Sequence, residues 1–338
     1  MLKIQKDIFL APYTTFRIGG LANYFAEASN TEEIRELCNW AKEKGIPILI
    51  LGGGSNVLVS DKGFEGLVIK IRNSKFEISA RGGSQPKADG PRVHASGGKN
   101  SGLRIKNSRI FSEAWVPLAK IVAEAVGAGL SGLEWAMGIP GTVGGAINGN
   151  AGAFGKSTSG SVEKVEVFDI AESKVRTLKN EECRFGYRNS LFKRNPNLII
   201  LSATFNFKKG NPDEMQKTIK DFVRQRLESI PSGYSAGSFF KNVGWEEVGD
   251  KEEIISKFPE LKQFSEKPKI SAGFLIDYLG LKGKKIGDAA VSEKHANFIL
   301  NLGNASAEQV VMLRNLIKER VHSHYGFNLE DEVVSVGL

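Results

Sequence analysis

The sequence predicts an α+β protein composed of several domains. Its 338 residues exceed the usual domain size of about 100–200 residues, so two or three folding units are expected. The hydrophobic pattern also changes along the chain. Helix and strand signals alternate at the start, short strands dominate the middle, and amphipathic helices dominate the last third. From these changes we predict three domains, at residues 1–72, 73–210 and 211–338.

The first domain opens with one helix and three strands. Ser29 and Glu32 have capping-box spacing, and apolar residues then recur at helical intervals until Gly45 and Pro47 end the helix. The strands are expected at residues 48–51, 57–60 and 67–71. The glycine-rich segment GGGSN, Gly52–Asn56, connects the first two strands, which gives a β-α-β start.

The second and third domains follow from similar signals. A helix at 117–126 and a glycine-dense span at 127–155 precede further strands. These strands are expected at residues 162–170, 174–178 and 198–207. The third domain begins with a long amphipathic helix that ends at Pro231, and its last helix opens with a capping box formed by Ser306 and Gln309.

The charge of the chain raises the question of a polyanionic partner. The net charge is +8 and the isoelectric point is near 9.3, which would suit nucleic acid or a phosphorylated small molecule. Most lysines and arginines alternate with acids, the ordinary pattern of a solvated surface, so we expect no nucleic-acid partner. The exception is a Gly/Ser/Pro-rich inserted loop at residues 79–109, and salt-dependent nucleic-acid binding through it is the alternative.

Cysteine and histidine usage indicates neither a disulfide nor a metal site. Cys38 and Cys183 are the two cysteines of the chain, and its four histidines lack ligand spacing for zinc. The first ten residues, MLKIQKDIFL, carry charges where a signal peptide needs an apolar stretch. No apolar run approaches the roughly 18 residues of a membrane span. We therefore expect a cytoplasmic protein that does not insert into membranes.

Two short patterns resemble nucleotide-binding signatures but lack their context. GAGLSG, Gly127–Gly132, has dinucleotide-binding spacing, yet it follows a helix and no acid lies about 20 residues further on. Near Gly155 the phosphate-binding P-loop pattern fails because Asn150 stands at its first glycine position. Neither a Rossmann fold nor an ATP-binding P-loop is expected.

Two longer glycine runs are better candidates for a cofactor cradle. Glycine lets backbone N–H groups approach a pyrophosphate closely, because no side chain intervenes. Two such runs in one chain favour a cradle over ordinary tight turns. The expected cofactor-binding residues are Gly52, Gly53, Gly54, Ser55, Asn56, Gly138, Ile139, Pro140, Gly141, Thr142, Gly144, Gly145, Asn150, Ala151 and Gly152.

Longer motifs then make the sequence recognisable. In chain order they are TTFRIGGLANYFAEA, GGGSNVLV, GLEWAMGIPGTVGGAINGNAGAFG, FGYRNSLFK, AGSFFKN, AGFLIDYLGLKGKKIGDAAVSEKHANFILN and LEDEV. Together they span nearly the whole chain, and the sequence resembles the UDP-N-acetylenolpyruvoylglucosamine reductase family. The resemblance implies a vanillyl-alcohol-oxidase-type (PCMH) fold with two FAD-binding subdomains, at 1–72 and 73–210, and a C-terminal α+β substrate domain.

The resemblance also implies a reaction and its cofactors. Members of this family pass hydride from NADPH to FAD and then to the enolpyruvyl ether of UDP-N-acetylglucosamine, a step in peptidoglycan precursor synthesis. Three residues match the family's catalytic groups. Ser238 in AGSFFKN corresponds to the proton donor, Arg188 in GYRNS to the arginine that binds the carboxylate, and Glu332 in LEDEV to the catalytic glutamate.

Four further residues are candidate substrate contacts. A UDP diphosphate needs cationic and amide donors, which can be supplied by side chains near these motifs. The candidates are Tyr187, Arg226, Lys241 and Asn242. Lys241 is also a candidate to support Ser238, because a serine hydroxyl is a weak acid that needs a stabilising neighbour.

Several positions of this sequence differ from the family pattern, and these differences leave two alternative functions open. Trp115 stands where the family has a small residue, Gly149 replaces a methionine, Val334 replaces an arginine, and GYS, Gly233–Ser235, interrupts the expected motif. The chain resembles the shorter branch, which lacks a tyrosine-bearing insertion. A flavin oxidase of the same fold, or a flavin-binding module without turnover, are the alternatives. A monomer is expected.

Overall fold

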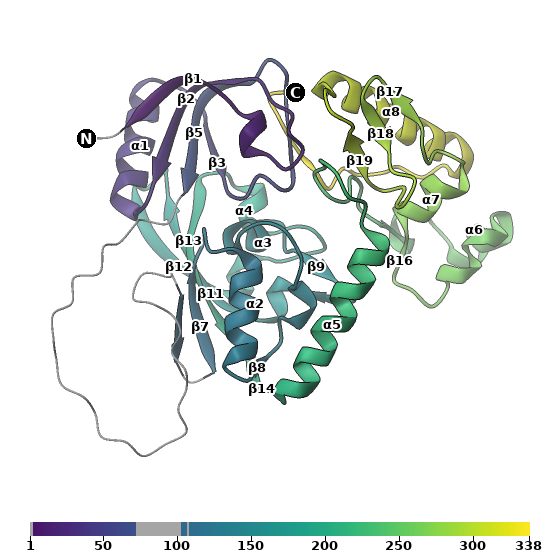
Figure 1. Ribbon diagram of the computed structural model, residues 1–338, viewed down its shortest axis with the longest axis horizontal. Coiled ribbons are helices and arrows are strands. Elements are labelled where there is room, and N and C mark those ends of the chain that lie inside the picture. Colours follow the sequence, from purple (N-terminus) through teal and green to yellow (C-terminus); the bar gives the residue numbers. More distant parts are fainter. Residues whose placement is uncertain (1–2, 72–102, 107) are drawn as a thin grey trace. The chain divides into compact units, whose positions relative to one another are not determined.

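The computed structural model describes residues 3–71, 103–106 and 108–338 (Figure 1). The chain forms two compact units. Unit 1 comprises residues 1–4, 26–53 and 69–225, and unit 2 comprises residues 5–25, 54–68 and 226–338. Most of the predicted basic loop lies outside the described residues, but strand β6, Leu103–Lys106, belongs to its C-terminal part. The three predicted domain ranges stay a prediction.

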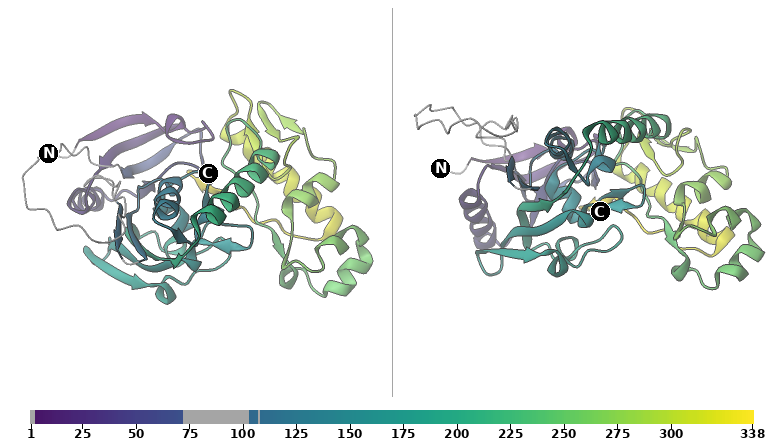
Figure 2. Two further views of the ribbon diagram at one scale, coloured as in Figure 1. Left: turned by 60° about the horizontal axis from the view of Figure 1, so that its bottom comes forward. Right: turned by 90° about the horizontal axis from the view of Figure 1, so that it is seen from below.

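Unit 1 contains a five-stranded antiparallel sheet in the order β12-β11-β13-β7-β6 (Figures 1 and 2). Besides β6, its strands are β7 Arg109–Glu113, β11 Val162–Asp169, β12 Lys174–Lys179 and β13 Leu198–Asn206. Helices α2, Leu118–Gly127, and α3, Val143–Asn148, pack their apolar residues into the same core. The predicted strands of the middle region are therefore confirmed to within one residue.

A four-stranded sheet has the order β1-β2-β5-β3. Its strands are β1 Ile4–Phe9, β2 Leu21–Ala28, β5 Phe64–Ile71 and β3 Ile48–Leu51. Helix α1, Thr31–Glu43, begins one residue later than predicted, because Asn30 and not Ser29 caps it. The Asn30 side chain accepts from the Glu33 amide at 2.9 Å, and the Glu33 carboxylate accepts from the Ser29 amide at 2.6 Å.

Unit 2 has its own core around the longest helix, α8, Ala307–Tyr325. Ser306 and Gln309 form the predicted capping box, and Gly326 ends the helix at φ +77°. Asp61 reinforces the start, since its carboxylate accepts from the amides of Ala307 and Glu308 at 2.9 and 3.1 Å. The inward residues are those predicted, namely Val310, Leu313, Ile317 and Val321.

The other regular elements of unit 2 are short. Helix α7, Ala272–Tyr278, is capped by the Ser271 side chain. A three-stranded sheet is formed by β17 Lys285–Ile286, β18 Ala289–Val291 and β19 Ile299–Asn301. Strand β20, Val334–Val336, pairs in parallel with β4, Val57–Val59. This last pair joins the C-terminal end of the chain to the segment that follows GGGSN.

The remaining elements connect these parts. The strands are β8 Leu130–Ser131, β9 Gly152–Ala153, β10 Lys156–Ser157, β14 Lys208–Lys209, β15 Val243–Gly244 and β16 Lys269–Ile270. The α-helices are α4 Leu191–Arg194, α5 Pro212–Ser229 and α6 Lys251–Lys257. The 3-10 helices are Ala11–Tyr13, Glu134–Ala136, Thr158–Gly160, Asn180–Cys183, Trp245–Glu247 and Pro259–Phe264.

The described residues are predicted to contain neither a membrane span nor a metal site nor a disulfide. None of the described helices combines the length and apolar character needed to cross a bilayer. The same residues contain no group of three or more His, Cys, Asp or Glu side chains that could hold a metal ion. Cys38 and Cys183 are both buried as free thiols, and burial raises the pKa of each to about 12.

The cap of α8 provides a test of unit 2. Replacing Asp61 with alanine removes the acceptor of two amides at a helix N-terminus, so we expect the free energy of unfolding to fall by about 1–2 kcal/mol. Chemical denaturation monitored by circular dichroism measures this change. Asp213→Ala, in the exposed first turn of α5, is the control and should change stability by less than about 0.5 kcal/mol. Equal effects would contradict the capping role of Asp61.

Candidate active site

In unit 1 the two glycine runs touch through their backbones. A Cβ atom added at Gly53 would lie 2.9 Å from the Cα of Gly141, and one added at Gly52 would lie 2.9 Å from Oγ1 of Thr142. Real Cβ atoms do not approach other atoms so closely, so only glycine fits at positions 52 and 53 without a shift of the second run. The predicted cofactor-binding residues Gly52, Gly53, Gly141 and Thr142 are therefore brought together by the fold.

The second run is held against the segment that leads into α2. Pro117 and Thr142 form an antiparallel bridge, and the Leu118 amide donates to the Gly141 carbonyl at 3.0 Å. The Val143 amide donates to the Val116 carbonyl at 2.9 Å. Thr142 also caps α3 through its hydroxyl, which accepts from the Gly145 amide at 3.3 Å. The second run is thus fixed to the segment before α2 by backbone hydrogen bonds on both sides of Thr142.

Trp115 lies in the turn between β7 and α2, two residues before Pro117. It is partly buried and packs against the hydrophobic core of unit 1. Its neighbours Ala114 and Val116 are buried in the same core, whereas Pro117, which bridges Thr142, is exposed. The indole Nε1 of Trp115 is buried and has no hydrogen-bond partner in the described part of the chain.

Asn150, another predicted cofactor residue, has its side chain engaged within unit 1. Its Nδ2 donates to the Gly186 carbonyl at 2.8 Å, and its Oδ1 accepts from the Ser159 amide at 3.0 Å. The residue is buried and adopts a left-handed conformation at φ +42°. Since both ends of the amide are used, Asn150 joins the glycine run to the turn that precedes Arg188.

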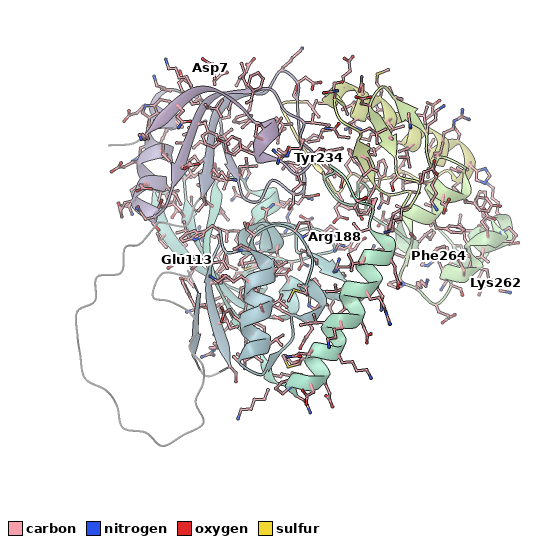
Figure 3. The ribbon with its side chains drawn as sticks, viewed as in Figure 1. Asp7, Glu113, Arg188, Tyr234, Lys262 and Phe264 are labelled. Atoms are coloured by element: carbon pink, nitrogen blue, oxygen red, sulfur yellow. The ribbon has the colours of Figure 1, made fainter. Side chains whose placement is uncertain are left out.

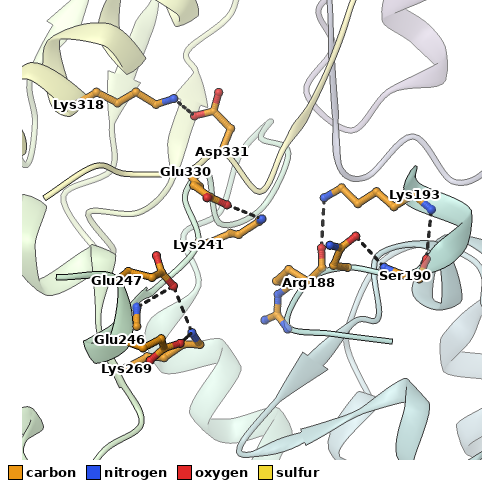
Figure 4. A network of polar contacts seen from close by, with 12 residues as sticks. Arg188, Ser190, Lys193, Lys241, Glu246, Glu247, Lys269, Lys318, Glu330 and Asp331 are labelled. Carbon is orange, nitrogen blue, oxygen red and sulfur yellow. Dashed lines mark hydrogen bonds and ion pairs between the residues drawn. The ribbon is translucent and has the colours of Figure 1, made fainter. Parts of the chain in front are cut away.

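Arg188 occupies that turn in a strained conformation (Figures 3 and 4). Its φ of +52° is left-handed, which costs a non-glycine residue about 1–3 kcal/mol and is concentrated at functional sites. The guanidinium Nη2 donates to the Gly152 carbonyl at 2.7 Å, and the Lys193 ammonium donates to the Arg188 carbonyl at 3.4 Å. Tyr187 is 39% exposed, and its ring lies 5.3 Å from the guanidinium carbon. The predicted carboxylate-binding arginine is thus attached to the glycine run.

In unit 2 the first glycine run continues against the N-terminal segment. Gly54 has φ +64°, and a Cβ there would lie 2.1 Å from the Tyr13 carbonyl oxygen. Asn56 reaches the C-terminal segment, because its Nδ2 donates to the Glu332 carbonyl at 3.1 Å. Its own carbonyl accepts from the Val334 amide at 3.0 Å. The backbone amide of Val334 therefore ties the residue that follows the LEDEV segment to Asn56.

Ser238 and Glu332 lie on neighbouring segments of unit 2. The Glu332 amide donates to the Phe239 carbonyl at 2.8 Å, and the Lys241 amide donates to the Glu330 carbonyl at 2.9 Å. On the other side, Ser238 forms an antiparallel bridge with Phe298. Both Ser238 and Glu332 are partly buried. Two of the three predicted catalytic residues are thus brought together within one unit, while Arg188 belongs to unit 1.

The other predicted substrate residues also belong to unit 2. The Lys241 ammonium lies 2.7 Å from the Glu330 carboxylate, an ion pair shown in Figure 4. The Asn242 Oδ1 accepts from the Ala272 amide at 3.1 Å, at the start of α7. Arg226 is half-buried, and this desolvation lowers the pKa of its guanidinium. Asn242 therefore has a structural contact besides its predicted one.

Comparisons with known proteins decide the family. Residues 22–179 match an FAD-binding domain model, and residues 225–336 match the C-terminal domain model of UDP-N-acetylenolpyruvoylglucosamine reductase. The reductase of that name from Synechococcus sp. (strain JA-3-3Ab) is 37% identical over 99% of this chain and 92% of its own length. The chain belongs to the UDP-N-acetylenolpyruvoylglucosamine reductase family. The predicted resemblance is confirmed.

Two further relatives support the family and the fold. The UDP-N-acetylenolpyruvoylglucosamine reductase of Clostridium novyi (strain NT) is 34% identical over 99% of this chain and 92% of its own length. The crystal structure of the reductase from Thermus caldophilus superimposes with a TM-score of 0.72 at 29% identity, covering 99% of this chain and 100% of that one. The predicted α+β, FAD-binding fold is confirmed.

The residues of unit 1 fit FAD, the cofactor of the family. Gly52 and Gly53 add no side chain where the first run meets Gly141 and Thr142, so this part of the chain presents backbone N–H groups and the Thr142 hydroxyl, groups that suit a pyrophosphate. The indole N–H of Trp115, two residues before the Pro117 that bridges Thr142, is a buried donor without an acceptor among the described residues.

Gly53 provides the test of this cradle. Gly53→Ala would place a methyl group 2.9 Å from the Gly141 Cα, so the two runs must separate. We expect the dissociation constant of FAD to rise at least about tenfold, the equivalent of 1.4 kcal/mol. Flavin absorbance and titration of the apoprotein measure this. Gly160→Ala is the control, because a Cβ there meets nothing within 4 Å. Unchanged FAD affinity in Gly53→Ala would contradict the cradle.

Proposed function

We propose that this chain reduces UDP-N-acetylglucosamine enolpyruvate to UDP-N-acetylmuramate, with NADPH as reductant and FAD as the hydride carrier, in peptidoglycan precursor synthesis. The observation that carries the proposal is the backbone contact between the Ser238 and Glu332 segments, in a chain 37% identical over 99% of its length to a protein of this name. The reaction needs an acid at one carbon and a charge-stabilising group at the adjacent carboxylate.

The chemistry defines the roles of the three catalytic candidates. FAD, held by the glycine runs at 52–56 and 138–152, would supply hydride chemistry when bound, linking NADPH to the methylene carbon of the enolpyruvyl group. The π electrons then move to the adjacent carbon and its carboxylate. Arg188 binds this carboxylate and stabilises the added charge, Ser238 donates the proton to the carbon, and Glu332 is the catalytic glutamate beside the serine. Hydride and proton together account for both added hydrogens.

Other residues would hold the substrate and the cofactor. Tyr187, Arg226, Lys241 and Asn242 bind the UDP-sugar in this proposal, with the cationic groups on the diphosphate. The glycine runs at 52–56 and 138–152 hold FAD. We also propose that the chain acts as a monomer in the cytoplasm, which size-exclusion chromatography with light scattering and cell fractionation would test.

The decisive experiment separates the two half-reactions. Purified protein is reduced anaerobically with NADPH while flavin absorbance is followed, and UDP-N-acetylglucosamine enolpyruvate is then added. Reoxidation of the flavin by this substrate, with formation of UDP-N-acetylmuramate, is expected. A flavin that stays reduced would contradict the proposal and favour a binding module. Reoxidation only by oxygen, with a sugar or hydroxy acid as reductant, would favour an oxidase.

Removal of the Ser238 hydroxyl should slow the reoxidation half-reaction and leave the reduction half-reaction unchanged. In Ser238→Ala we expect substrate-dependent flavin reoxidation to slow by about 10²–10⁴-fold, the usual contribution of a positioned acid. Reduction of the flavin by NADPH should keep its normal rate, because that step needs no proton from serine. Stopped-flow absorbance measures both rates. Ser335→Ala, an exposed serine in β20, is the control. An unchanged reoxidation rate in Ser238→Ala would exclude it as the proton donor.

Trp115 should contribute to FAD binding through its N–H group. Trp115→Phe keeps an aromatic ring but removes the donor, so we expect the dissociation constant of FAD to rise about 3–10-fold, as for loss of one hydrogen bond. Stability of the apoprotein should be unchanged or higher, because a buried donor without a partner is removed. Trp245→Phe, whose Nε1 donates to the Lys267 carbonyl in unit 2, is the control and should lose stability without losing FAD affinity. The opposite pattern would contradict this role.

A further inference from the structure

The segment that carries Ser238 is held by a buried asparagine on another part of unit 2. Asn297 is 4% exposed and lies in the turn before β19. Its Oδ1 accepts from the Phe240 amide at 2.9 Å, and its Nδ2 donates to the Phe240 carbonyl at 2.8 Å. Its main-chain carbonyl accepts from the Phe239 amide at 2.7 Å. One residue thus satisfies both polar groups of Phe240 and the amide of Phe239.

The same segment carries the contact to Glu332. The one polar backbone group of Phe239 and Phe240 that Asn297 does not bind is the Phe239 carbonyl, and it accepts from the Glu332 amide at 2.8 Å. The rings of Phe239 and Phe240 are buried in the core of unit 2, 5.2 Å apart. Asn297 and the LEDEV segment therefore hold opposite sides of a two-residue strip that begins directly after Ser238.

Only an amide side chain of this length supplies the pair of contacts. A carboxamide offers a donor and an acceptor on one carbon, which match the N–H and C=O of a single residue. Aspartate would lose the donor, and alanine would leave both groups of Phe240 buried without a side-chain partner, which is destabilising. Because both contacts depend on the carboxamide, Asn297 fixes the position of the Phe240 backbone in addition to filling space in the core.

The turn that presents Asn297 is itself ordered. The Ser292 hydroxyl accepts from the amides of Lys294 and His295, and Nδ1 of His295 accepts from the Asn297 amide at 3.2 Å. Burial lowers the pKa of His295, so the ring stays neutral and keeps Nδ1 as an acceptor at neutral pH. His295 therefore binds the backbone amide of Asn297, while the Asn297 side chain binds the backbone of Phe240, two residues after Ser238.

We propose that Asn297 is a positioning residue for proton transfer, which holds the Ser238 hydroxyl in register with Glu332 by binding Phe239 and Phe240. The inference rests on the proposed function, because it concerns the step in which Ser238 is the acid. A misplacement of about 1 Å in a reacting group can slow a reaction about 10²-fold. The loss should therefore appear in the rate of the proton-transfer step and not in the affinity for substrate.

The test compares two buried asparagines of unit 2. Asn297→Ala should slow substrate-dependent flavin reoxidation at saturating substrate by about 10–100-fold, leave flavin reduction by NADPH unchanged, and change the substrate dissociation constant less than about threefold. Asn301→Ala is the matched control. Asn301 is equally buried, but its side chain holds Phe16, Gly303 and Ala305. It should lower thermal stability without slowing reoxidation.

The solvent isotope effect on flavin reoxidation is a second measurement, and loss of stability alone would not change it. If proton transfer becomes limiting, the ratio of reoxidation rates in H₂O and D₂O should rise in Asn297→Ala and stay at the wild-type value in Asn301→Ala. If Asn297→Ala does not fold, Asn297→Asp, which keeps the length of the side chain and loses the donor to the Phe240 carbonyl, is judged by the same criteria.

The outcomes separate this inference from the proposed function. Slowed reoxidation in Ser238→Ala with normal reoxidation in both Asn297 variants would overturn the positioning role and leave Ser238 as the acid. Normal reoxidation in Ser238→Ala would overturn the proposed acid and the inference with it. Equal slowing of both half-reactions in Asn297→Ala, or equal slowing in Asn301→Ala, would indicate general disorder and also overturn the inference.

Discussion

The parallel pairing of β20 with β4 is the interaction on which the candidate catalytic segments of unit 2 depend. Val334, Ser335 and Val336 pair with Val57, Leu58 and Val59, so the last strand of the chain lies beside one near its start. The pairing continues beyond the strands, since Asn56 binds the backbone on both sides of Val333. Because the Glu332 carbonyl is bonded by Asn56 at the end of this paired region, its position is determined by a contact between residues 276 positions apart in the sequence.

In unit 1 the equivalent constraint is steric. The glycine runs approach so closely that a methyl group on Gly53 would force them apart. The second run is tied to Arg188, whose guanidinium binds the Gly152 carbonyl while its backbone is left-handed. The residues proposed to hold FAD and the arginine proposed to bind the substrate carboxylate are therefore parts of one local framework.

In each unit, asparagine side chains join segments that are distant in the sequence by binding backbone groups. Asn150 in unit 1, and Asn56 and Asn297 in unit 2, each use the side-chain amide to bind backbone groups of another segment. The sequence predicts a cofactor role for Asn56 and Asn150 because they stand among glycines, whereas no local pattern distinguishes Asn297. An amide beside a glycine run is expected to face a ligand, but a buried one is more often satisfied by backbone, since buried polar groups must find partners.

By itself, the sequence determined the family, the α+β class and most helix and strand positions. These depend on local signals, such as the capping box of α8 and the apolar, β-branched residues of β11 and β13, or on motifs long enough to be specific. The shift of the α1 cap from Ser29 to Asn30 shows the limit of such signals, because both residues are competent caps one position apart. Only the tertiary structure placed Glu332 beside the Ser238 segment, paired Lys241 with Glu330 and made Asn297 the residue that holds Phe240. These contacts join distant parts of the chain, and no local pattern records which backbone group a buried amide will meet.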